Sequence, residues 1–446
     1  MKKKILFTLV GAFLICFISF WIIVSGGYDK QNKVILFLKK IVPLSIAREV
    51  RDKFFFIPKL QDRNKFLELQ LAKYEQKLNG NLYLDKDENI NNKYNYNLKK
   101  FFLPFPSLDL SLGWQAKKNS VRAHYLDVVD ENVIVISGEG ETIFFKLENI
   151  NKKSLNQKYI SNNLNNVLDS RDSKLAAVRD LFYEDNFIYV SVVELKNNKS
   201  TLNIYRAKKS LDFLKFEIFF ESKEVNENLK GYSIQTGGRI ESFKDNKILL
   251  SIGYLNKYPS AQDKNSLAGK IISINKETRE HTLMSLGHRN PQGLFFWKER
   301  DIIINSEHGP FGGDEINFNF LKEEKIKNFG WPISSYGVPY PGQDKNFYES
   351  HGYLKKSHDE YGFIEPFKYF TPSIGISEII QNNNSIYASS LRAESIYILE
   401  VEGEKKISSI QRLKFGNRIR DLKYDERFGV FLILFENVPS IGVLKF

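Results

Sequence analysis

Cysteine is almost absent from this sequence, since the 446 residues include one, Cys16. A disulfide framework and a zinc or redox site of the Cys-x-x-Cys kind are both excluded, because each needs at least two cysteines. Cys16 lies within an apolar run, which is not the electropositive setting in which a reactive thiolate forms. Long amphipathic helices of the kind that cover a parallel α/β sheet are also lacking in the second half of the chain, so a doubly wound fold is not expected.

Negative charge is the scarcer sign, with 53 acidic residues against 65 lysines and arginines and a formal net charge of +12. Residues 1–80 hold nine of these excess positive charges, because they contain 12 lysines and 3 arginines against 6 acidic residues. The remainder of the chain is close to neutral, so nucleic-acid binding loses its electrostatic basis. A basic segment that faces the anionic headgroups of a membrane accounts better for the charge.

One long apolar run is present near the start of the chain. Residues 5–24 carry no charged side chain and follow three lysines, and a run of this length is enough to cross a bilayer as a helix. We expect residues 1–27 to form an N-terminal transmembrane anchor or export signal. A cleaved signal is the alternative, although its apolar core is normally only about 7–15 residues long.

Residues 28–100 predict a short helical stalk followed by a linker. Apolar residues recur at helical spacing among lysine, glutamate and glutamine, notably from Phe66 to Leu78. The simplest interpretation is a spacer between a membrane and a folded domain, and a partner-binding or self-associating helix is the alternative. An Asn/Lys/Tyr-rich stretch then leads to a second domain, which we expect over residues 101–446.

Beyond residue 100 one pattern recurs six times: a short apolar segment, a polar turn, and a second segment of β-branched and aromatic residues. The copies begin at Tyr125, Asp180, Arg239, Gly293, Ser377 and Arg420. The second and sixth copies share the tripeptide Arg-Asp-Leu, at 179–181 and 420–422. Such segments favour strands, and unevenly spaced repeats of this size are typical of propeller blades. The sequence therefore predicts an all-β fold, a six-bladed β-propeller in which each blade buries its faces against its neighbours.

Two polar motifs near the fourth copy are candidates for function, and the first is GHRNPQG at residues 287–293. Arg289 offers a planar fork of donors for a carboxylate or a quinone oxygen, and Asn290 beside it can both donate and accept. Taken alone, the motif is also explained as a polar turn that opens a strand.

The second motif reads EHGPFGGDEIN at residues 307–317. Asp314 and Glu315 follow a glycine-rich loop whose carbonyl groups are free to turn inward, and hard oxygen ligands of this kind suit Ca²⁺. A solvated acidic turn is the alternative. His308 has no second histidine or cysteine at ligand spacing, which indicates a structural hydrogen-bonding residue rather than a transition-metal ligand.

Eight motifs taken together resemble the glucose/sorbosone dehydrogenase family, which includes glucose and aldose sugar dehydrogenases that use pyrroloquinoline quinone (PQQ). They are GGR at 237–239, AQDKNSLAGKI from Ala261, GHRNPQGL from Gly287, EHGPFGGDEIN from Glu307, NFGWP from Asn328, PSIGIS from Pro372, SSLRAES from Ser389 and RIRDL from Arg418. The set follows the family's order over roughly residues 230–425 and leaves residues 1–100 uncovered.

The resemblance implies a six-bladed propeller that holds PQQ across its central channel. Arg289 and Asn290 would contact the quinone, and Arg392 would approach it from a later blade. A hydride would pass from a sugar or another alcohol to the cofactor while a base takes the hydroxyl proton.

The resemblance also implies Ca²⁺ at the cofactor site. The backbone carbonyls of Gly309 and Pro310 would bind the ion of the cofactor, and Asp314 and Glu315 would belong to the neighbouring calcium-binding loop. Ca²⁺ and Arg289 would draw electron density from the quinone and make it a better hydride acceptor.

The catalytic base of the family is missing from its expected position. Members carry histidine four residues before the arginine of the GGR-like motif, where this chain has Gln235. Glutamine orients a hydroxyl but accepts no proton near neutral pH, so a general-base contribution of about 10²–10⁴ needs another source. Asp180, or a water held by Gln235, is a candidate replacement. Phe329 also stands where the family usually has tyrosine, which is harmless if only the backbone is used.

Three functions remain open on the sequence. The first is a quinoprotein dehydrogenase, the second is a propeller that binds a carbohydrate or protein partner without oxidising it, and the third is a hydrolase such as a lactonase. For the dehydrogenase, the resemblance implies a propeller in the periplasm that passes electrons to a membrane quinone or a cytochrome. The apolar run and the basic stalk predict that it is anchored to the membrane near that acceptor.

Overall fold

The computed structural model describes residues 81–91, 95–105, 123–225, 235–323, 325–340 and 342–446. Over these ranges, no helix is both long enough and apolar enough to cross a membrane. The predicted anchor at residues 1–27 and the stalk that follows it lie outside the described residues.

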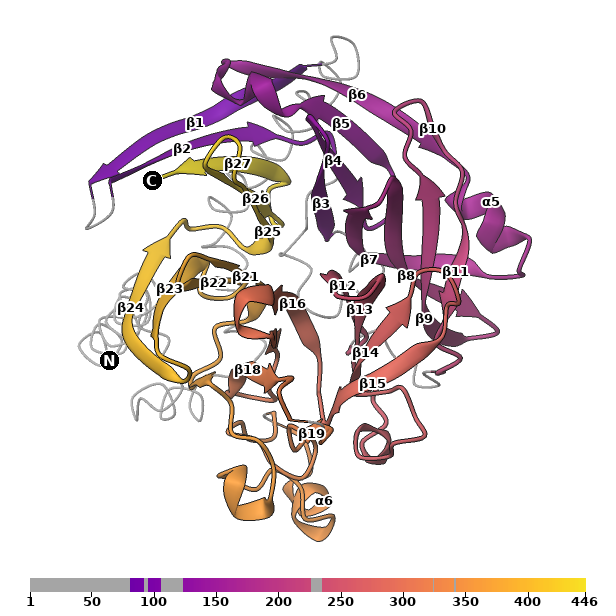
Figure 1. The fold of residues 1–446 in the computed structure, drawn as a ribbon, viewed down its shortest axis with the longest axis vertical. Coiled ribbons are helices and arrows are strands. Elements are labelled where there is room, and N and C mark those ends of the chain that lie inside the picture. The colour runs from indigo at the N-terminus through magenta and orange to yellow at the C-terminus, as the bar shows by residue number, and fades with distance from the viewer. Residues whose placement is uncertain (1–80, 92–94, 106–122, 226–234, 324, 341) are drawn as a thin grey trace, which may run out of the picture. The chain divides into compact units, whose positions relative to one another are not determined.

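Six antiparallel blades stand around a common central axis, as Figure 1 shows, which confirms the prediction of an all-β, six-bladed propeller. We call the region between the innermost strands the channel. The innermost strands are β3 (His124–Val129), β7 (Lys174–Glu184), β12 (Gly237–Phe243), β16 (Pro291–Trp297), β21 (Ile376–Asn382) and β25 (Ile419–Asp425). The second strands are β4 (Asn132–Ser137), β8 (Phe187–Lys196), β13 (Lys247–Ile252), β17 (Ile302–Glu307), β22 (Ser385–Ser390) and β26 (Val430–Phe435). Each of the six sequence repeats forms one of these inner pairs.

The third and outer strands complete the blades. The third strands are β5 (Thr142–Lys146), β9 (Lys199–Lys208), β14 (Lys270–Asn275), β18 (Asp314–Phe320), β23 (Ser395–Glu402) and β27 (Ser440–Lys445). The outer strands are β6 (Ser154–Asn162), β11 (Glu217–Glu221), β15 (His281–Leu286), β20 (Lys368–Phe370), β24 (Lys406–Lys414) and β2 (Asn95–Phe102).

Several short strands and helices lie outside the four main strands of each blade. They are the strands β1 (Asn81–Asn91), β10 (Phe213–Leu214) and β19 (Lys327–Asn328), the α-helices α5 (Leu164–Asp169) and α6 (Lys345–Ser350), and the 3₁₀ helices η2 (Leu147–Asn151), η3 (Pro259–Ala261), η4 (Lys298–Arg300) and η5 (Asp359–Tyr361).

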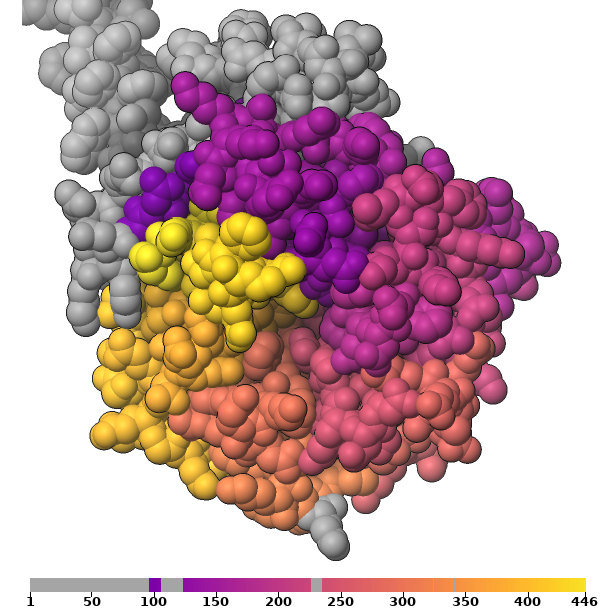
Figure 2. All heavy atoms as spheres, turned by 45° about the horizontal axis from the view of Figure 1, so that its top comes forward, coloured from indigo at the N-terminus to yellow at the C-terminus, as the bar shows by residue number. Residues whose placement is uncertain are grey.

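The ring closes by pairing an N-terminal strand with the C-terminal one. Strand β2 runs antiparallel to β27, with Leu98 opposite Leu444, and completes the sixth blade. In Figure 2 the indigo N-terminal residues accordingly lie against the yellow C-terminal ones. The domain boundary expected at residue 101 therefore falls inside β2 and is corrected, because residues 95–100 supply backbone hydrogen bonds to the propeller rather than a linker.

The hydrophobic core fills the wedges between neighbouring blades. On β4, Val133 and Val135 pack with the sixth blade, whereas Ile134 and Ile136 pack with the second. Both faces of the strand are buried, so its sequence is continuously apolar instead of alternating. Burial on both faces fixes the angle between blades, and this rigid ring holds the loops at the ends of the channel.

Candidate functional site

A buried histidine and glutamate fix the start of β16. The Nδ1 atom of His288 lies 2.9 Å from Glu307 Oε1, and its Nε2 atom lies 2.8 Å from the Ser285 hydroxyl. Glu307 Oε2 accepts a 2.6 Å hydrogen bond from the backbone N–H of Arg289. Burial acts to raise the pKa of Glu307, but the His288 imidazole and the surrounding donors hold that pKa below its usual value. The ionised carboxylate therefore fixes the backbone from which Arg289 projects.

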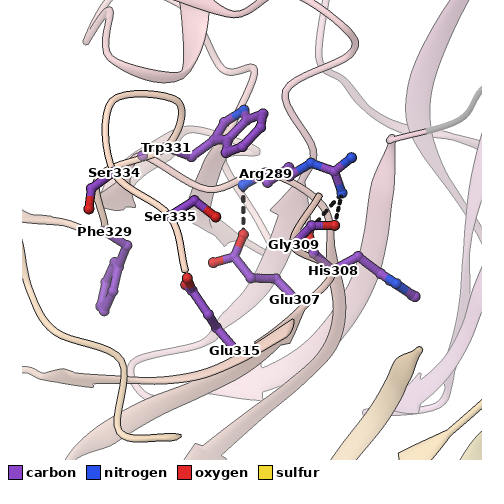
Figure 3. A pocket seen from close by; sticks show the side chains of 10 residues that line it. Arg289, Glu307, His308, Gly309, Glu315, Phe329, Trp331, Ser334 and Ser335 are labelled. Carbon is purple, nitrogen blue, oxygen red and sulfur yellow. Dashed lines mark hydrogen bonds between the residues drawn. The ribbon is translucent and has the colours of Figure 1, made fainter. Parts of the chain in front are cut away.

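The Arg289 side chain crosses to the loop between β17 and β18, as Figure 3 shows. Its Nη1 group donates to the carbonyl oxygens of His308 at 2.8 Å and Gly309 at 2.7 Å. The guanidinium carbon lies 5.1 Å from the centre of the Trp331 ring. Arg289 Nε is buried and has no hydrogen-bond acceptor among the described residues. A buried charged donor without a partner is unfavourable, so this atom is suited to an acceptor on a bound molecule.

The Asn290 side chain contacts the backbone two residues after Gln235. Asn290 Oδ1 accepts a 3.2 Å hydrogen bond from the backbone N–H of Gly237. The Gln235 backbone has a φ of 69°, and a Cβ on Gly253 would lie 2.1 Å from its carbonyl oxygen, so glycine is required at that position. The side-chain Oε1 of Gln235 is buried and has no donor in the part of the chain that the structure describes. The segment that carries Gln235 is thus joined to Asn290, and the Gln235 side chain has an open acceptor.

Two arginines to which the sequence assigned no role stand at the same end of the channel. Arg420 donates through Nη1 to Gln292 Oε1 at 3.0 Å and through Nη2 to Glu436 Oε2 at 3.0 Å. Arg418 Nη2 lies 3.5 Å from the same oxygen of Glu436. The Nε atoms of both arginines are buried without an acceptor in the described ranges. The available signal was the Arg-x-Arg spacing at the start of a strand, which directs both side chains to one face.

The positive charges of these arginines affect the pKa of His308. Burial lowers the pKa of His308 to about 4, an effect that Asp314 opposes and that Arg289, Arg420 and Arg418 reinforce. Its side chain is 23% exposed, and Nδ1 lies 4.0 Å from Asp314 Oδ1, which is too long for a hydrogen bond. The neutral imidazole therefore borders the site without the firm hydrogen bond that its predicted structural role requires.

Asp314 holds two backbone segments together through three N–H groups. Its Oδ1 accepts from the N–H of Gly309 at 3.2 Å, and its Oδ2 accepts from the N–H groups of Gly375 at 2.7 Å and Ile376 at 3.0 Å. The carboxylate is fully buried. Both oxygens are therefore occupied by the protein, and this predicted calcium residue holds loops in position.

Glu315, one residue later, has far weaker partners. Its Oε2 lies 3.4 Å from Asn317 Nδ2, and its Oε1 lies 3.5 Å from His358 Nε2. Glu315 faces Glu307 across the β17–β18 pair, and burial together with the Glu307 charge raises its pKa well above the usual value. Both carboxyl groups line a small pocket beside Arg289, drawn in Figure 3. A cation at this pocket would relieve the repulsion between the two acids.

No cluster of three or more histidine, cysteine, aspartate or glutamate side chains with metal-site geometry exists among the residues that the structure describes. A calcium ion bound largely by backbone carbonyls has no such signature, so the predicted Gly309 and Pro310 ligands stay a prediction. The Pro310 ring packs beneath Gly337, where a Cβ would lie 2.5 Å from Pro310 Cγ. That contact fixes the loop on which both carbonyls stand.

Arg392 and Asp180 are the remaining predicted site residues. Arg392 is exposed, and its backbone N–H donates to Ile374 at 3.0 Å, next to the Gly375 that binds Asp314. Asp180 lies in the channel, where Oδ1 is 2.9 Å from Arg239 Nη1 and Oδ2 accepts from the backbone N–H of Ile240 at 2.7 Å. Both Asp180 oxygens are thus engaged, which makes this residue a poor replacement for the family's base.

The Phe329 ring stacks on His288 with 4.9 Å between the ring centres and is almost completely buried. A phenylalanine suits this contact, because a buried tyrosine hydroxyl here would need a partner of its own. The departure at Phe329 therefore leaves the backbone of the NFGWP segment in place.

Comparison with known proteins decides the family, because residues 130–440 match the model described as Glucose / Sorbosone dehydrogenase. The chain belongs to the glucose/sorbosone dehydrogenase family. Aldose sugar dehydrogenase YliI of Escherichia coli strain K12 is 28% identical over 209 residues, which span 42% of this chain and 53% of that relative, about half its length. An uncharacterized protein of Synechocystis is 24% identical over 296 residues, 58% of this chain and 67% of the relative.

Solved structures of the family share the fold. A crystal structure of glucose dehydrogenase is 20% identical with a TM-score of 0.59, and the match covers 73% of this chain and 97% of that one. Soluble aldose sugar dehydrogenase from Escherichia coli in its apo form is 20% identical with a TM-score of 0.56, covering 73% and 96%. The PQQ-bound aldose sugar dehydrogenase from Streptomyces coelicolor is 17% identical with a TM-score of 0.53, covering 73% and 94%.

Proposed function

We propose that this member of the glucose/sorbosone dehydrogenase family is a PQQ-dependent dehydrogenase that oxidises a sugar or another alcohol. The observation that carries the proposal is the trio Arg289, Arg418 and Arg420, whose buried Nε atoms lack acceptors among the described residues. A structure of the same fold, from Streptomyces coelicolor, has PQQ bound.

The open groups of the site fit the chemistry of PQQ. The cofactor carries carboxylates and quinone oxygens, which are acceptors, and arginine forks pair well with both. When bound, PQQ would supply a quinone that accepts a hydride. The three arginines would hold it, and the charges of Arg289 and Arg420 are little screened by water because both residues are buried.

Calcium fits this site at some of the predicted residues and not at others. Glu315 is buried with weak partners, which suits a hard cation, whereas both oxygens of Asp314 are taken by backbone N–H groups. The Gly309 carbonyl already accepts from Arg289, so an ion there would share it with the guanidinium. Glu315, with the carbonyls of Gly309 and Pro310, would therefore hold Ca²⁺, and Asp314 would only shape the loop.

The reaction also needs a proton acceptor, and this is where the chain differs from its family. Gln235 Oε1 is an open acceptor that would orient the substrate hydroxyl. Because Asp180 is held by Arg239 and by the backbone of Ile240, we assign the proton to a water held by Gln235. Water is a weaker base than imidazole, so slow turnover is expected.

A propeller that binds a carbohydrate or a protein partner without oxidising it is the second candidate. The observation that favours it is Gln235 itself, since an amide stands where the family's base is expected. A family member that has lost catalysis but still binds its ligand would be expected to lack the base and to keep the binding groups.

We also propose a location and an electron acceptor. The apolar run at residues 5–24 and the basic segment after it support an N-terminal anchor, with the propeller in the periplasm and electrons passing to a membrane quinone or a cytochrome. The full chain is expected to stay with membranes after an alkaline carbonate wash. Its release by that wash would contradict the anchor.

The test of the function is dye reduction by the full chain with PQQ, Ca²⁺ and a panel of aldoses and alcohols. PQQ-dependent reduction of an artificial acceptor supports the dehydrogenase. Saturable sugar binding without reduction supports the binding protein. Product release that needs no acceptor would point to a hydrolase and contradict both.

A further inference from the structure

One arginine in the channel contacts the innermost strand of every other blade. Arg239, on β12, is 4% exposed. Its guanidinium contacts are the Tyr125 ring at 4.8 Å, Asp180 Oδ1 at 2.9 Å, the Gln292 carbonyl at 2.7 Å, Glu378 Oε2 at 2.9 Å, Asp421 Oδ1 at 2.9 Å and the Arg420 carbonyl at 3.0 Å. We call Arg239 and these six partners the channel hub.

The acids of the channel hub also join neighbouring blades. Asp180 Oδ2 accepts from the N–H of Ile240 at 2.7 Å, and Asp421 Oδ2 accepts from the N–H of Leu126 at 2.8 Å. Three carboxylates surround one guanidinium, and burial raises the pKa of Asp180 to about 6 and that of Glu378 well above its usual value. Without the cation, the buried acids would repel one another and separate the strands that carry them.

Two of the Arg239 contacts lead directly to the candidate site. Nε binds the carbonyl of Gln292, and Nη2 binds that of Arg420. The Gln292 side chain accepts from Arg420 Nη1 at 3.0 Å and donates to Asn290 Oδ1 at 3.2 Å. Asn290 Oδ1 also accepts from the N–H of Gly237, two residues before Arg239. The hydrogen bonds therefore form a closed ring that starts and ends on β12.

We propose that Arg239 is a positioning residue for this site: through the backbone of Gln292 and Arg420 it sets where the side chains of Asn290 and Arg420 stand. Each nitrogen of its own guanidinium already meets a protein acceptor. The consequence for cofactor binding rests on the proposed function, whereas the positioning of the loop does not.

Arg239→Lys in the full chain is the direct test. Lysine keeps the charge but lacks the planar fork, so it cannot meet the carboxylates and both carbonyls together. Loss of these hydrogen bonds should accelerate hydrogen exchange of the Gly237 amide by about tenfold and weaken PQQ binding by about tenfold. The amide of Val135, in the first blade, should exchange at an unchanged rate.

Arg206→Lys is the matched control, because it shortens a charged side chain of the second blade whose Nε lies 3.0 Å from Glu217. It should change neither PQQ affinity nor Gly237 exchange. If Arg239→Lys lowers the Tm while both readouts stay at the wild-type level, Arg239 only stabilises the fold and the proposal is overturned.

The two proposals fail in different ways. If the wild-type chain binds no PQQ, the proposed function fails, but Gly237 exchange still decides whether Arg239 positions the loop. If Arg239→Lys does not fold, Gln292→Ala interrupts the same ring from its other side and should accelerate Gly237 exchange by about tenfold. An unchanged exchange rate in that variant would refute the ring as the positioning element.

Discussion

Four arginines at the innermost strands, Arg239, Arg289, Arg418 and Arg420, differ in how their donors are used. In Arg239, Nε, Nη1 and Nη2 each meet an acceptor of the protein. In Arg289, Arg418 and Arg420, the Nε atom is buried without one among the described residues. An arginine enclosed by protein acceptors holds neighbouring backbone segments in position, whereas an arginine with an open donor is suited to an acceptor from outside the protein.

Two adjacent carboxylates repeat the contrast. Asp314 accepts three backbone N–H groups at 2.7–3.2 Å, whereas the nearest polar contacts of Glu315 are at 3.4 and 3.5 Å. We therefore infer that Asp314 holds the loops in place, whereas Glu315 is available to bind a ligand. Substitutions at the engaged and at the open groups should therefore have different effects.

Of the substitutions at groups without a protein partner, Arg289→Ala should have the largest effect, and it should act on PQQ affinity. Removal of a charged donor that would face PQQ is expected to weaken PQQ binding by about 1,000-fold, since hydrogen bonds to charged groups contribute about 1.5–3 kcal/mol each. Equilibrium dialysis of the full chain measures this. Arg412→Ala, on the outer strand β24, is the control and should bind as the wild type does. Equal affinity in both variants would place the cofactor elsewhere.

Gln235→His tests the open acceptor at the site. Restoring imidazole should raise the rate of dye reduction by about 100-fold, because a general base typically contributes 10²–10⁴. The gain should increase as the pH rises through about 6.5, since only the neutral imidazole accepts a proton. Gln235→Asn should show no gain. If PQQ binds and histidine still brings no increase at any pH, the proton acceptor lies elsewhere.

Asp314→Asn and Glu315→Gln form a matched pair. The first replaces an acceptor of three N–H groups with an amide that has one oxygen, and we expect it to lower the free energy of unfolding by about 2 kcal/mol. The second should leave that free energy within about 0.5 kcal/mol or raise it, because it removes a buried acid with only long polar contacts that faces Glu307. Urea denaturation measures both. The reverse order would contradict the assignment of scaffold and ligand roles.

The smallest effect concerns Glu241, which follows Arg239 on β12. Burial raises the pKa of Glu241 to about 7, although Lys423 opposes the shift. The folded-state pKa lies above the unfolded one, so this group stabilises the fold at low pH, and that contribution is lost as the pH rises through about 7. Between pH 5 and pH 8 the wild type should lose about 1 kcal/mol more stability than Glu241→Gln. Parallel pH profiles of the two proteins would contradict this.

The blades could be predicted because their signal is local. Each copy carries its own apolar segments and turn, so Tyr125 or Gly293 marks a strand pair without reference to the rest of the chain. Strand β2 could not be found this way, because its partner is β27 at the other end of the chain and pairs Leu98 with Leu444. Closure of a ring is a long-range property that no local pattern contains.

Site residues that lie in contiguous motifs could likewise be predicted, whereas those brought together only by folding could not. Arg289, Asn290 and the Glu307–Asn317 loop could be identified because each lies in a contiguous motif. The channel hub could not, because its acids come from three different repeats and become neighbours only when the ring closes. The one sequence feature that pointed to the channel hub was the Arg-Asp-Leu tripeptide shared by two copies. The aspartates of both copies bind Arg239.

Calorimetric titration of the full chain with PQQ, with and without Ca²⁺, tests the central claim most directly. The account predicts saturable binding at one site per chain, strengthened by Ca²⁺ and lost in Arg289→Ala. Absence of binding at any Ca²⁺ concentration in a protein that is folded by circular dichroism would contradict it, because the open arginines would then serve some other ligand.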